Sequence, residues 1–290
     1  MQISVVIPLY NQKDSLKFTL EGFNNQKTKY KFKIIIIDDG SEESSEDIIK
    51  QFYELDLKYI YQEHKGRAAA RNAAIPWLNS DITIFNDCDR IPEENFVEMH
   101  VKNLKKNSIC IGCPKEIYVS GNEERSKKIH HIILENNRLA RELRYSKIID
   151  VLFDENGKEI SLLSWLGTFS GNLSIYTEHL KTGLWYDEKF TNWGLENLEF
   201  GYRAKQKGLE LHRIRTAINY HIVHPRGKGF YEENIKINHK YFYSKYPTKE
   251  IYLLKPFMLG EISLQSYEKQ ISSVVSWENK TSKELYNKIL

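Results

Sequence analysis

The stretch KIIIIDDGS, residues 33–41, decides the fold. Its four consecutive isoleucines are typical of a parallel strand that is buried on both faces of a sheet. The run stops at Asp38, Asp39 and Gly40, as expected where a strand reaches the edge of a sheet at which ligands bind. The stretch therefore predicts an α/β protein with a parallel central sheet.

Strand and helix patterns alternate on either side of this stretch. Upstream, residues 3–7 are a β-branched run that Pro8 halts, and Leu16, Leu20 and Phe23 follow at helical spacing. Downstream, we expect helices at 45–55 and 66–78, the latter broken by Pro76, and strands at 58–62 and 81–86. Such alternation implies βαβ crossovers, so helices should flank a mostly parallel sheet.

The rhythm changes after about residue 114. The patterns there predict a long cation-rich helix at 122–147, a loop and strand at 166–176, a helix within 192–208, a glycine-rich basic loop at 225–230, a helix at 231–246 and a charged helical tail. The basic loop is a candidate lid.

Composition narrows the class of protein. With 41% hydrophobic and 28% charged residues, the 290-residue chain is globular, and a net charge of +3 does not argue for nucleic acid. Three cysteines favour a reducing interior, and we expect Cys110 and Cys113 to be buried strand residues. The opening MQISVVIPLYNQ does not resemble a signal peptide, and we expect no membrane span. A cytoplasmic location is expected, with peripheral membrane contact left open.

Two carboxylates follow the apolar strand in ITIFNDCDRIP, residues 82–92. Asp87 and Asp89 could hold a divalent ion through hard oxygen ligands, and that ion would neutralise a diphosphate leaving group. The alternative is that they are turn residues. At the neighbouring strand end, Asp39 could accept the imide N–H of a uracil or could simply shape the turn. Arg67 and Arg71 share one helical face and could reach base or phosphates, or be solvated.

Four motifs occur in order over the first 90 residues: VVIPLYN (5–11), IIIIDDGS (34–41), GRAAARN (66–72) and IFNDCD (84–89). Together they resemble the N-terminal half of family 2 glycosyltransferases with the GT-A fold. The resemblance implies a nucleotide-sugar transferase. It assigns the uracil to Asp39 and Arg71, the base pocket to Pro8 and Tyr10, the ribose or sugar to Asp87, and the metal at the diphosphate to Asp89.

A second set of motifs lies further on, with GNLSIY at 171–176 and NWGLENLEFGYRAKQKG at 192–208. They resemble the W-G-G-E-D/N-x-E-F segment shared by chondroitin-polymerase-type, galactosyl- and polypeptide N-acetylgalactosaminyltransferases. The likeness implies that Trp193 packs on the sugar or acceptor and that Glu196 and Asn197 lie at the reaction centre. INYHIVH (218–224) resembles the segment that supplies a late histidine ligand, for which His221 is the first choice and His224 the second.

The chain departs from these patterns at the reaction centre. Leu195 replaces the family's second glycine, and Asn197, which cannot take a proton, stands where inverting relatives often carry the catalytic aspartate. Glu196 is therefore the best candidate base and Glu199 the alternative. Both glutamates could instead be ordinary acids near a helix N-terminus.

The whole predicts a GT-A enzyme that uses Mn²⁺ or Mg²⁺ to move a hexose or N-acetylhexosamine from a UDP-sugar to a hydroxyl. Inversion is favoured, and retention stays open because E-N-L-E is nearer the retaining polypeptide N-acetylgalactosaminyltransferases. A glycan is the first choice of acceptor and a peptide the second, and Arg226 and Lys228 would assist the leaving group. We expect a nucleotide-sugar-binding half at 1–113, an acceptor-binding and catalytic half with a helical insertion at 114–246, and a helical tail at 247–290. The alternatives are a silent sugar-nucleotide-binding module and a nucleotidyltransferase, which the glycine-free PLYNQKDS disfavours.

Overall fold

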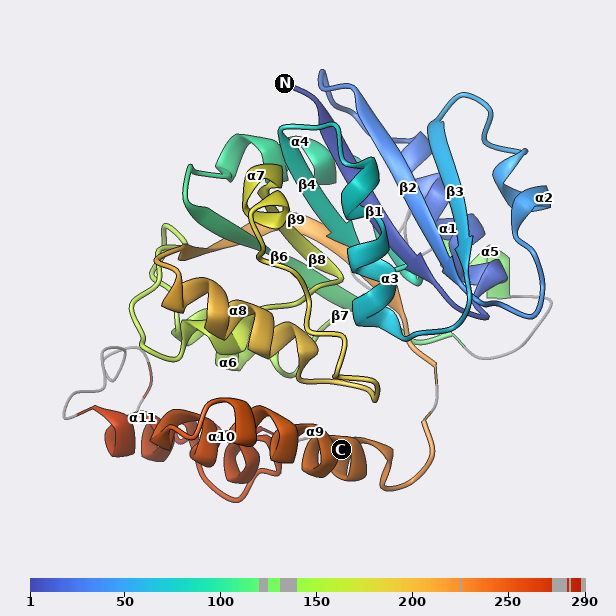
Figure 1. The fold of residues 1–290 in the computed structure, drawn as a ribbon. Helices are drawn as coiled ribbons and strands as arrows, with labels where there is room; N and C mark the ends of the chain where they lie inside the picture. The colour runs from blue at the N-terminus through green and yellow to red at the C-terminus, as the bar shows by residue number, and fades with distance from the viewer. Residues whose placement is uncertain (120–124, 131–139, 225, 273–280, 282, 288–290) are drawn as a thin grey trace.

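The computed structural model describes residues 1–119, 125–130, 140–224, 226–272, 281 and 283–287. Within these residues nine strands form one twisted sheet with helices on both faces (Figure 1). The strands are β1 (Ile3–Leu9), β2 (Phe32–Asp39), β3 (Asp56–Gln62), β4 (Ile82–Asn86), β5 (Arg90–Pro92), β6 (Ser108–Ile117), β7 (Arg141–Glu142), β8 (Asn172–Tyr176) and β9 (Glu210–Ile222).

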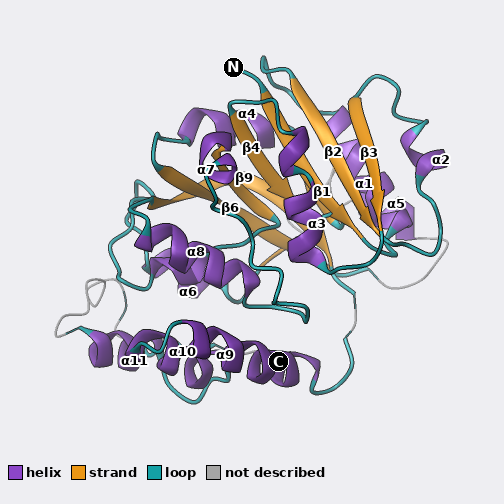
Figure 2. Ribbon diagram, in the orientation of Figure 1, coloured by secondary structure: helices purple, strands orange, loops and turns teal. Residues whose placement is uncertain are grey.

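The helices cover the sheet and form a further layer beneath it (Figure 2). They are α1 (Lys13–Asn24), α2 (Glu46–Ile49), α3 (Arg67–Ala73), α4 (Phe96–Asn103), α5 (Arg125–His130), α6 (Ser146–Val151), α7 (Thr177–Lys181), α8 (Glu196–Gln206), α9 (Phe230–Lys245), α10 (Lys249–Met258) and α11 (Leu264–Ile271), with 3₁₀ turns η1 (Ile75–Trp77) and η4 (Ser164–Gly167). No helix among the described residues is both long enough and apolar enough to cross a membrane.

The strand order is β3-β2-β1-β4-β8-β6-β9-β5, with β7 paired to β6. The first four strands along the chain pair in parallel, as predicted. β8 enters antiparallel between β4 and β6, while β9 runs parallel to β6 and antiparallel to β5. The sheet is therefore parallel in the first third of the chain and mixed beyond it.

The isoleucine run of β2 explains how the layers are held. Ile34 and Ile36 belong to the apolar cluster beneath α1 and α4, whereas Ile35 and Ile37 belong to the opposite cluster, which includes side chains of α3 and α8. Successive side chains of a strand point to opposite faces, so a strand covered on both sides must be apolar throughout. Side chains of α9, α10 and α11 extend the second cluster as an outer layer.

The long strand β9 places residues of the second half beside the carboxyl end of β4. Its C-terminal part pairs with β5, in a register that sets His221 opposite Arg90. Ile222 donates its backbone N–H to the Asp89 carbonyl at 2.9 Å. The sheet thus joins sequence segments more than a hundred residues apart at the edge where the aspartate pair lies.

Several predicted helices have different bounds in the structure. The prediction of a helix over 122–147 is confirmed at α5, but one continuous helix is wrong, because Arg141 and Glu142 pair with β6 and a helix begins again only at Ser146. Residues 122–124 and 131–139 lie outside the described residues. Strand pairing there overrides the local helical preference. The helix predicted at 45–55 is shorter in the structure, where α2 spans only Glu46–Ile49. The break at Pro76 is confirmed, since α3 ends before η1.

Candidate active site

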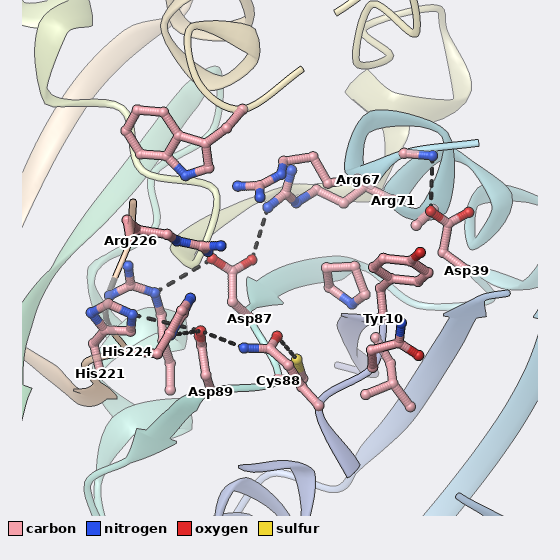
Figure 3. A pocket seen from close by; sticks show the side chains of 18 of the residues that line it. Tyr10, Asp39, Arg67, Arg71, Asp87, Cys88, Asp89, His221, His224 and Arg226 are labelled. Atoms are coloured by element: carbon pink, nitrogen blue, oxygen red, sulfur yellow. Dashed lines mark hydrogen bonds and ion pairs between the residues drawn. The ribbon is translucent and has the colours of Figure 1, made fainter. Parts of the chain in front are cut away.

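A cleft of about 560 Å³ opens at the carboxyl ends of β1, β2 and β4. Figure 3 shows Tyr10 and Asp39 at one end, Asp89, His221 and His224 at the other, and Asp87 between them. The first end comes from the β1–α3 region, whereas the second combines Asp89, which follows β4, with histidines from β9 and the residues just after it.

Asp39 is tightly held at its end of the cleft. Its carboxylate accepts backbone N–H groups of Lys65 (2.9 Å) and Gly66 (2.8 Å) and the amide of Gln62 (2.6 Å). The imidazole of His64 lies 2.9 Å from the same carboxylate and stacks on the Tyr10 ring with centroids 4.1 Å apart. Two of the residues expected at the base, Asp39 and Tyr10, are thus both in contact with His64.

Two arginines fix Asp87 in the middle of the cleft. Arg71, 2% exposed, donates to the Asp87 carboxylate at 2.8 Å, and Arg90 lies 3.4 Å from its other oxygen. Burial alone would raise the pKa of Asp87, but the charges of Arg71 and Arg90 hold it below its ordinary value. Asp87 is therefore a carboxylate held in a fixed orientation.

Glu196 lies directly behind this pair, at the first residue of α8. Its Oε1 is 3.6 Å from Arg71 Nη1 and 3.9 Å from Arg67 Nη1. The side chain is buried, and Oε2 has no hydrogen-bond partner among the described residues. Arg71 therefore connects Asp87 to Glu196, whose second carboxylate oxygen has no partner in the described part of the chain.

Asp89, His221 and His224 form the other end. The Asp89 Oδ2 atom is 3.6 Å from His221 Nε2 and 3.8 Å from His224 Nδ1. Burial would raise the pKa of Asp89, but hydrogen bonding to His221 and the charges of His221 and Arg90 hold it well below its ordinary value. Burial and the charge of Arg226 lower the pKa of His224, which favours its neutral form.

The donor atoms of these three residues fit a metal ion. All lie within 4.8 Å of one another, and two ligands each about 2.1 Å from one ion lie roughly 3–4 Å apart. A carboxylate with two imidazoles suits Mn²⁺ or Zn²⁺ better than Ca²⁺. Gln12 donates to the same Asp89 oxygen at 3.1 Å and orients it.

Two buried asparagine side chains hold the backbone that carries the aspartates. Asn219 on β9 donates to Asn86 Oδ1 (2.8 Å) and to the Gly171 carbonyl (2.7 Å), and Asn86 donates to the backbone carbonyls of Asp87 and Arg90. A Cβ on Gly171 would lie 2.4 Å from both Asp87 Oδ2 and Arg90 Nε. The glycine of GNLSIY therefore lets the backbone pass directly under Asp87.

Most residues singled out from the sequence come together here. The cleft is lined by Pro8, Tyr10, Asp39, Arg67, Arg71, Asp87, Asp89, Trp193, His221, His224 and Arg226. Arg71, however, contacts Asp87 and Glu196 rather than Asp39. Asn197 donates to the Thr168 carbonyl at 2.6 Å. Lys228 is exposed and is not among the lining residues.

Glu199 is not brought to the cleft. It is fully buried and paired with Arg203 at 2.9 Å and Lys245 at 2.8 Å. Sequence reasoning missed Arg90, Gln12 and Asn219 at the site. β9 carries several other polar and charged residues, so its sequence pattern gave no signal for Asn219.

The comparisons with known proteins agree with this geometry. The family model described as glycosyl transferase family 2 matches residues 4–164, and that of the N-terminal domain of galactosyltransferase matches 162–225. A chondroitin synthase of Escherichia coli is 30% identical over 91% of this chain, which spans only 42% of that relative's length.

Solved structures share the fold. Staphylococcus aureus TarS in complex with UDP superposes with a TM-score of 0.59 at 17% identity, over 96% of this chain and 77% of that one. GalNAc-T7 with UDP, GalNAc and Mn²⁺ superposes with a TM-score of 0.57 at 19% identity, over 93% of this chain and 54% of that one. Both superpositions establish the fold as GT-A.

Proposed function

This chain belongs to glycosyltransferase family 2, and from that premise we propose that it transfers a hexose or N-acetylhexosamine from a UDP-sugar to a hydroxyl acceptor with the aid of a divalent metal ion. The acceptor that we favour is a growing glycan, as the name of the E. coli relative suggests. We place the donor along the cleft with its base at Tyr10 and its diphosphate toward Asp89.

The observation that carries this proposal is a group of buried polar atoms without hydrogen-bond partners among the described residues. They are Arg71 Nε, Arg90 Nη1, Glu196 Oε2 and His221 Nδ1. Leaving such an atom unsatisfied costs about 1–3 kcal/mol. Arg71, Arg90 and His221 line the cleft, and Glu196 is paired with Arg71 just outside its lining. Two guanidinium groups suit an anionic ligand, and a carboxylate oxygen suits a hydroxyl.

The metal site is proposed from Asp89, His221 and His224, whose donor atoms lie close enough to share an ion. A bound Mn²⁺, which suits this ligand set better than Mg²⁺, would supply positive charge to the leaving diphosphate. Gln12 orients Asp89 for this role, and Arg90 adds further positive charge. GalNAc-T7 was solved together with UDP, GalNAc and Mn²⁺, which supports the same type of ion here.

In the proposed reaction, Glu196 Oε2 accepts the proton of the acceptor hydroxyl. The acceptor oxygen forms a bond to the anomeric carbon while the bond from that carbon to the diphosphate oxygen breaks, with inversion, and UDP carries away the electron pair. Asp87, held by Arg71 and Arg90, orients the sugar by accepting hydrogen bonds from its hydroxyls. Arg226, which lines the cleft, would contact the diphosphate.

The test is calorimetric titration of the full chain with UDP, with and without Mn²⁺, repeated on Asp89→Ala. We expect Mn²⁺-dependent binding that the variant loses. Slow release of UDP from a UDP-sugar without acceptor would separate an enzyme from a silent binding module. Binding that is indifferent to both metal and substitution would overturn the proposed donor site.

A further inference from the structure

The turn that carries Trp193 into the cleft is held from outside by helix α9. We infer that Asn238, with Asn234, is a positioning residue that sets Trp193 and the start of α8 for the acceptor. The inference rests on the proposed function, and it concerns residues that line no part of the cleft themselves.

The turn cannot hold its own shape. Two successive residues, Gly194 (φ 88°) and Leu195 (φ 68°), are in the left-handed region. A non-glycine residue there persists only when its surroundings hold it. A Cβ on Gly194 would meet nothing within 4 Å, so glycine is needed for its backbone angle and not for space. Glu196 follows directly as the first residue of α8, so its position depends on this turn.

Asn238 supplies the support. Its buried side-chain amide donates to three consecutive backbone carbonyls, those of Asn192 (3.3 Å), Trp193 (3.0 Å) and Gly194 (2.5 Å). One turn earlier on α9, Asn234 Oδ1 accepts the backbone N–H of Trp193 at 3.1 Å. Two asparagines thus bind the backbone of one turn from both its donor and its acceptor side.

The ring of Trp193 is held by the same part of α9. Phe230, Asn234 and Asn238 recur every four residues and therefore share one helix face. The Phe230 ring lies 5.9 Å from the Trp193 ring and that of Tyr231 lies 4.8 Å from it. Trp193 and Tyr231 both line the cleft, and aromatic surfaces of this kind pack well against the apolar face of a sugar.

These contacts separate the donor end of the cleft from the turn that carries Trp193. The donor end is built on β1, β2, β4 and the end of β9, whereas the amides of α9 reach only the turn at 192–194. Loss of the Asn238 amide should therefore shift Trp193 and Glu196 while leaving the groups at Asp39 and Asp89, where we place the base and the diphosphate, unchanged. Acceptor use should suffer and donor binding should not.

The test variant is Asn238→Asp, which keeps the size of the side chain but replaces the donating NH₂ by an oxygen that faces three carbonyls. Asn287→Asp is the matched control, because Asn287 is also buried and its amide donates to a single carbonyl, that of Met258, at 2.9 Å. Steady-state kinetics would use UDP-sugars with a panel of hexose, N-acetylhexosamine and hexuronic acid methyl glycosides as acceptors. Hydrogen exchange of the 192–197 amides would be followed in the same three full-length proteins.

We expect the acceptor KM of Asn238→Asp to rise by about ten- to a hundredfold and kcat to fall as Glu196 shifts. The Mn²⁺-dependent affinity for UDP should stay unchanged, and the amides of 192–197 should exchange faster. Asn287→Asp should change neither. An unaltered exchange pattern in Asn238→Asp, or equal losses of donor and acceptor binding, would overturn the inference. Failure of the proposed function looks different, since the wild-type chain itself would then neither bind UDP nor transfer sugar.

Discussion

The imidazole of His64 stacks on the ring of Tyr10 while contacting the carboxylate of Asp39 at 2.9 Å. His64 therefore occupies both partners that we propose for the base of the donor. Of the groups around Asp39, the Lys65 and Gly66 N–H donors are backbone, whereas the half-exposed His64 ring can leave by rotating. A base that stacks on the same face of Tyr10 would displace it.

This relationship predicts that His64→Ala binds UDP more tightly than the native chain. Removing a competitor that makes one stack and one polar contact should strengthen binding by about 1 kcal/mol, or roughly fivefold. Calorimetry with UDP and Mn²⁺ measures the change. Tyr10→Ala is the control with the opposite expectation, since it should bind UDP more weakly. Weaker binding by His64→Ala would mean that His64 contacts the base instead of competing with it.

The two histidines near Asp89 are predicted to contribute similarly to Mn²⁺ affinity, since their nitrogens lie 3.6 Å and 3.8 Å from the same Asp89 oxygen. His221→Ala and His224→Ala should each lower the affinity for Mn²⁺ by about ten- to a hundredfold, and the double variant should bind none. Titration of free Mn²⁺ followed by electron paramagnetic resonance reports this directly. If one single variant binds Mn²⁺ as the native chain does, that histidine is not a ligand.

Substitution of the two glutamates of α8 should have different effects, one on sugar transfer and the other on stability. Glu196→Gln removes the proposed proton acceptor and should abolish sugar transfer while UDP still binds. Glu199→Gln removes one partner of a buried ion-pair group formed with Arg203 and Lys245, so the free energy of unfolding should fall by about 3 kcal/mol. Transfer by the folded protein should survive.

Urea denaturation and transfer assays on both variants separate these roles. Full transfer activity in Glu196→Gln would remove it as the base. Loss of activity in a fully stable Glu199→Gln would restore the alternative that the sequence left open.

Gly171→Ala should disturb the centre of the cleft, because the added methyl would lie 2.4 Å from atoms of Asp87 and Arg90. We expect affinity for UDP-sugar to fall by about tenfold or more as Asp87 is forced to shift. Gly227→Ala is the control, since a Cβ there meets nothing within 4 Å and its φ is not positive. Equal affinities in the two variants would show that Asp87 tolerates the displacement.

Stability should fall in mild acid because of His100. This histidine is fully buried between Ser174 and Asn172, and burial lowers its pKa from 6.5 to about 4. A group whose pKa is depressed by folding is neutral in the native state, so its contribution is complete above pH 6.5 and is lost as the pH falls toward 4. Between pH 7 and 5 this amounts to about 2 kcal/mol.

Urea denaturation of the native chain and of His100→Gln at pH 7, 6 and 5 measures the effect. As the pH falls, the free energy of unfolding should decline more steeply in the native chain than in His100→Gln. Equal slopes against pH would show that His100 does not titrate in this way. The substitution itself lowers the free energy of unfolding by an amount that does not depend on pH, so the slope and not the absolute value carries the effect of His100.

The parallel part of the fold and the identity of the cleft residues could be predicted from the sequence because both depend on local patterns. A buried parallel strand must be apolar throughout, and polar residues just after it lie at one edge, which is why Asp39 and Asp87 were found. The strand at 141–142 could not be predicted, since it forms only by pairing with β6. The burial of Glu199 was equally hidden, because Lys245 reaches it from another helix.

His221 meets Asp89 only because β9 has joined the sheet opposite β5. A nascent chain that has not yet been synthesised past residue 224 carries Asp89 without either imidazole in place, and therefore has no ion site to offer. If the proposed chemistry holds, truncated or half-folded copies consume no sugar nucleotide. The register of β9 against β5 thus decides whether Asp89 and His221 lie close enough to share an ion.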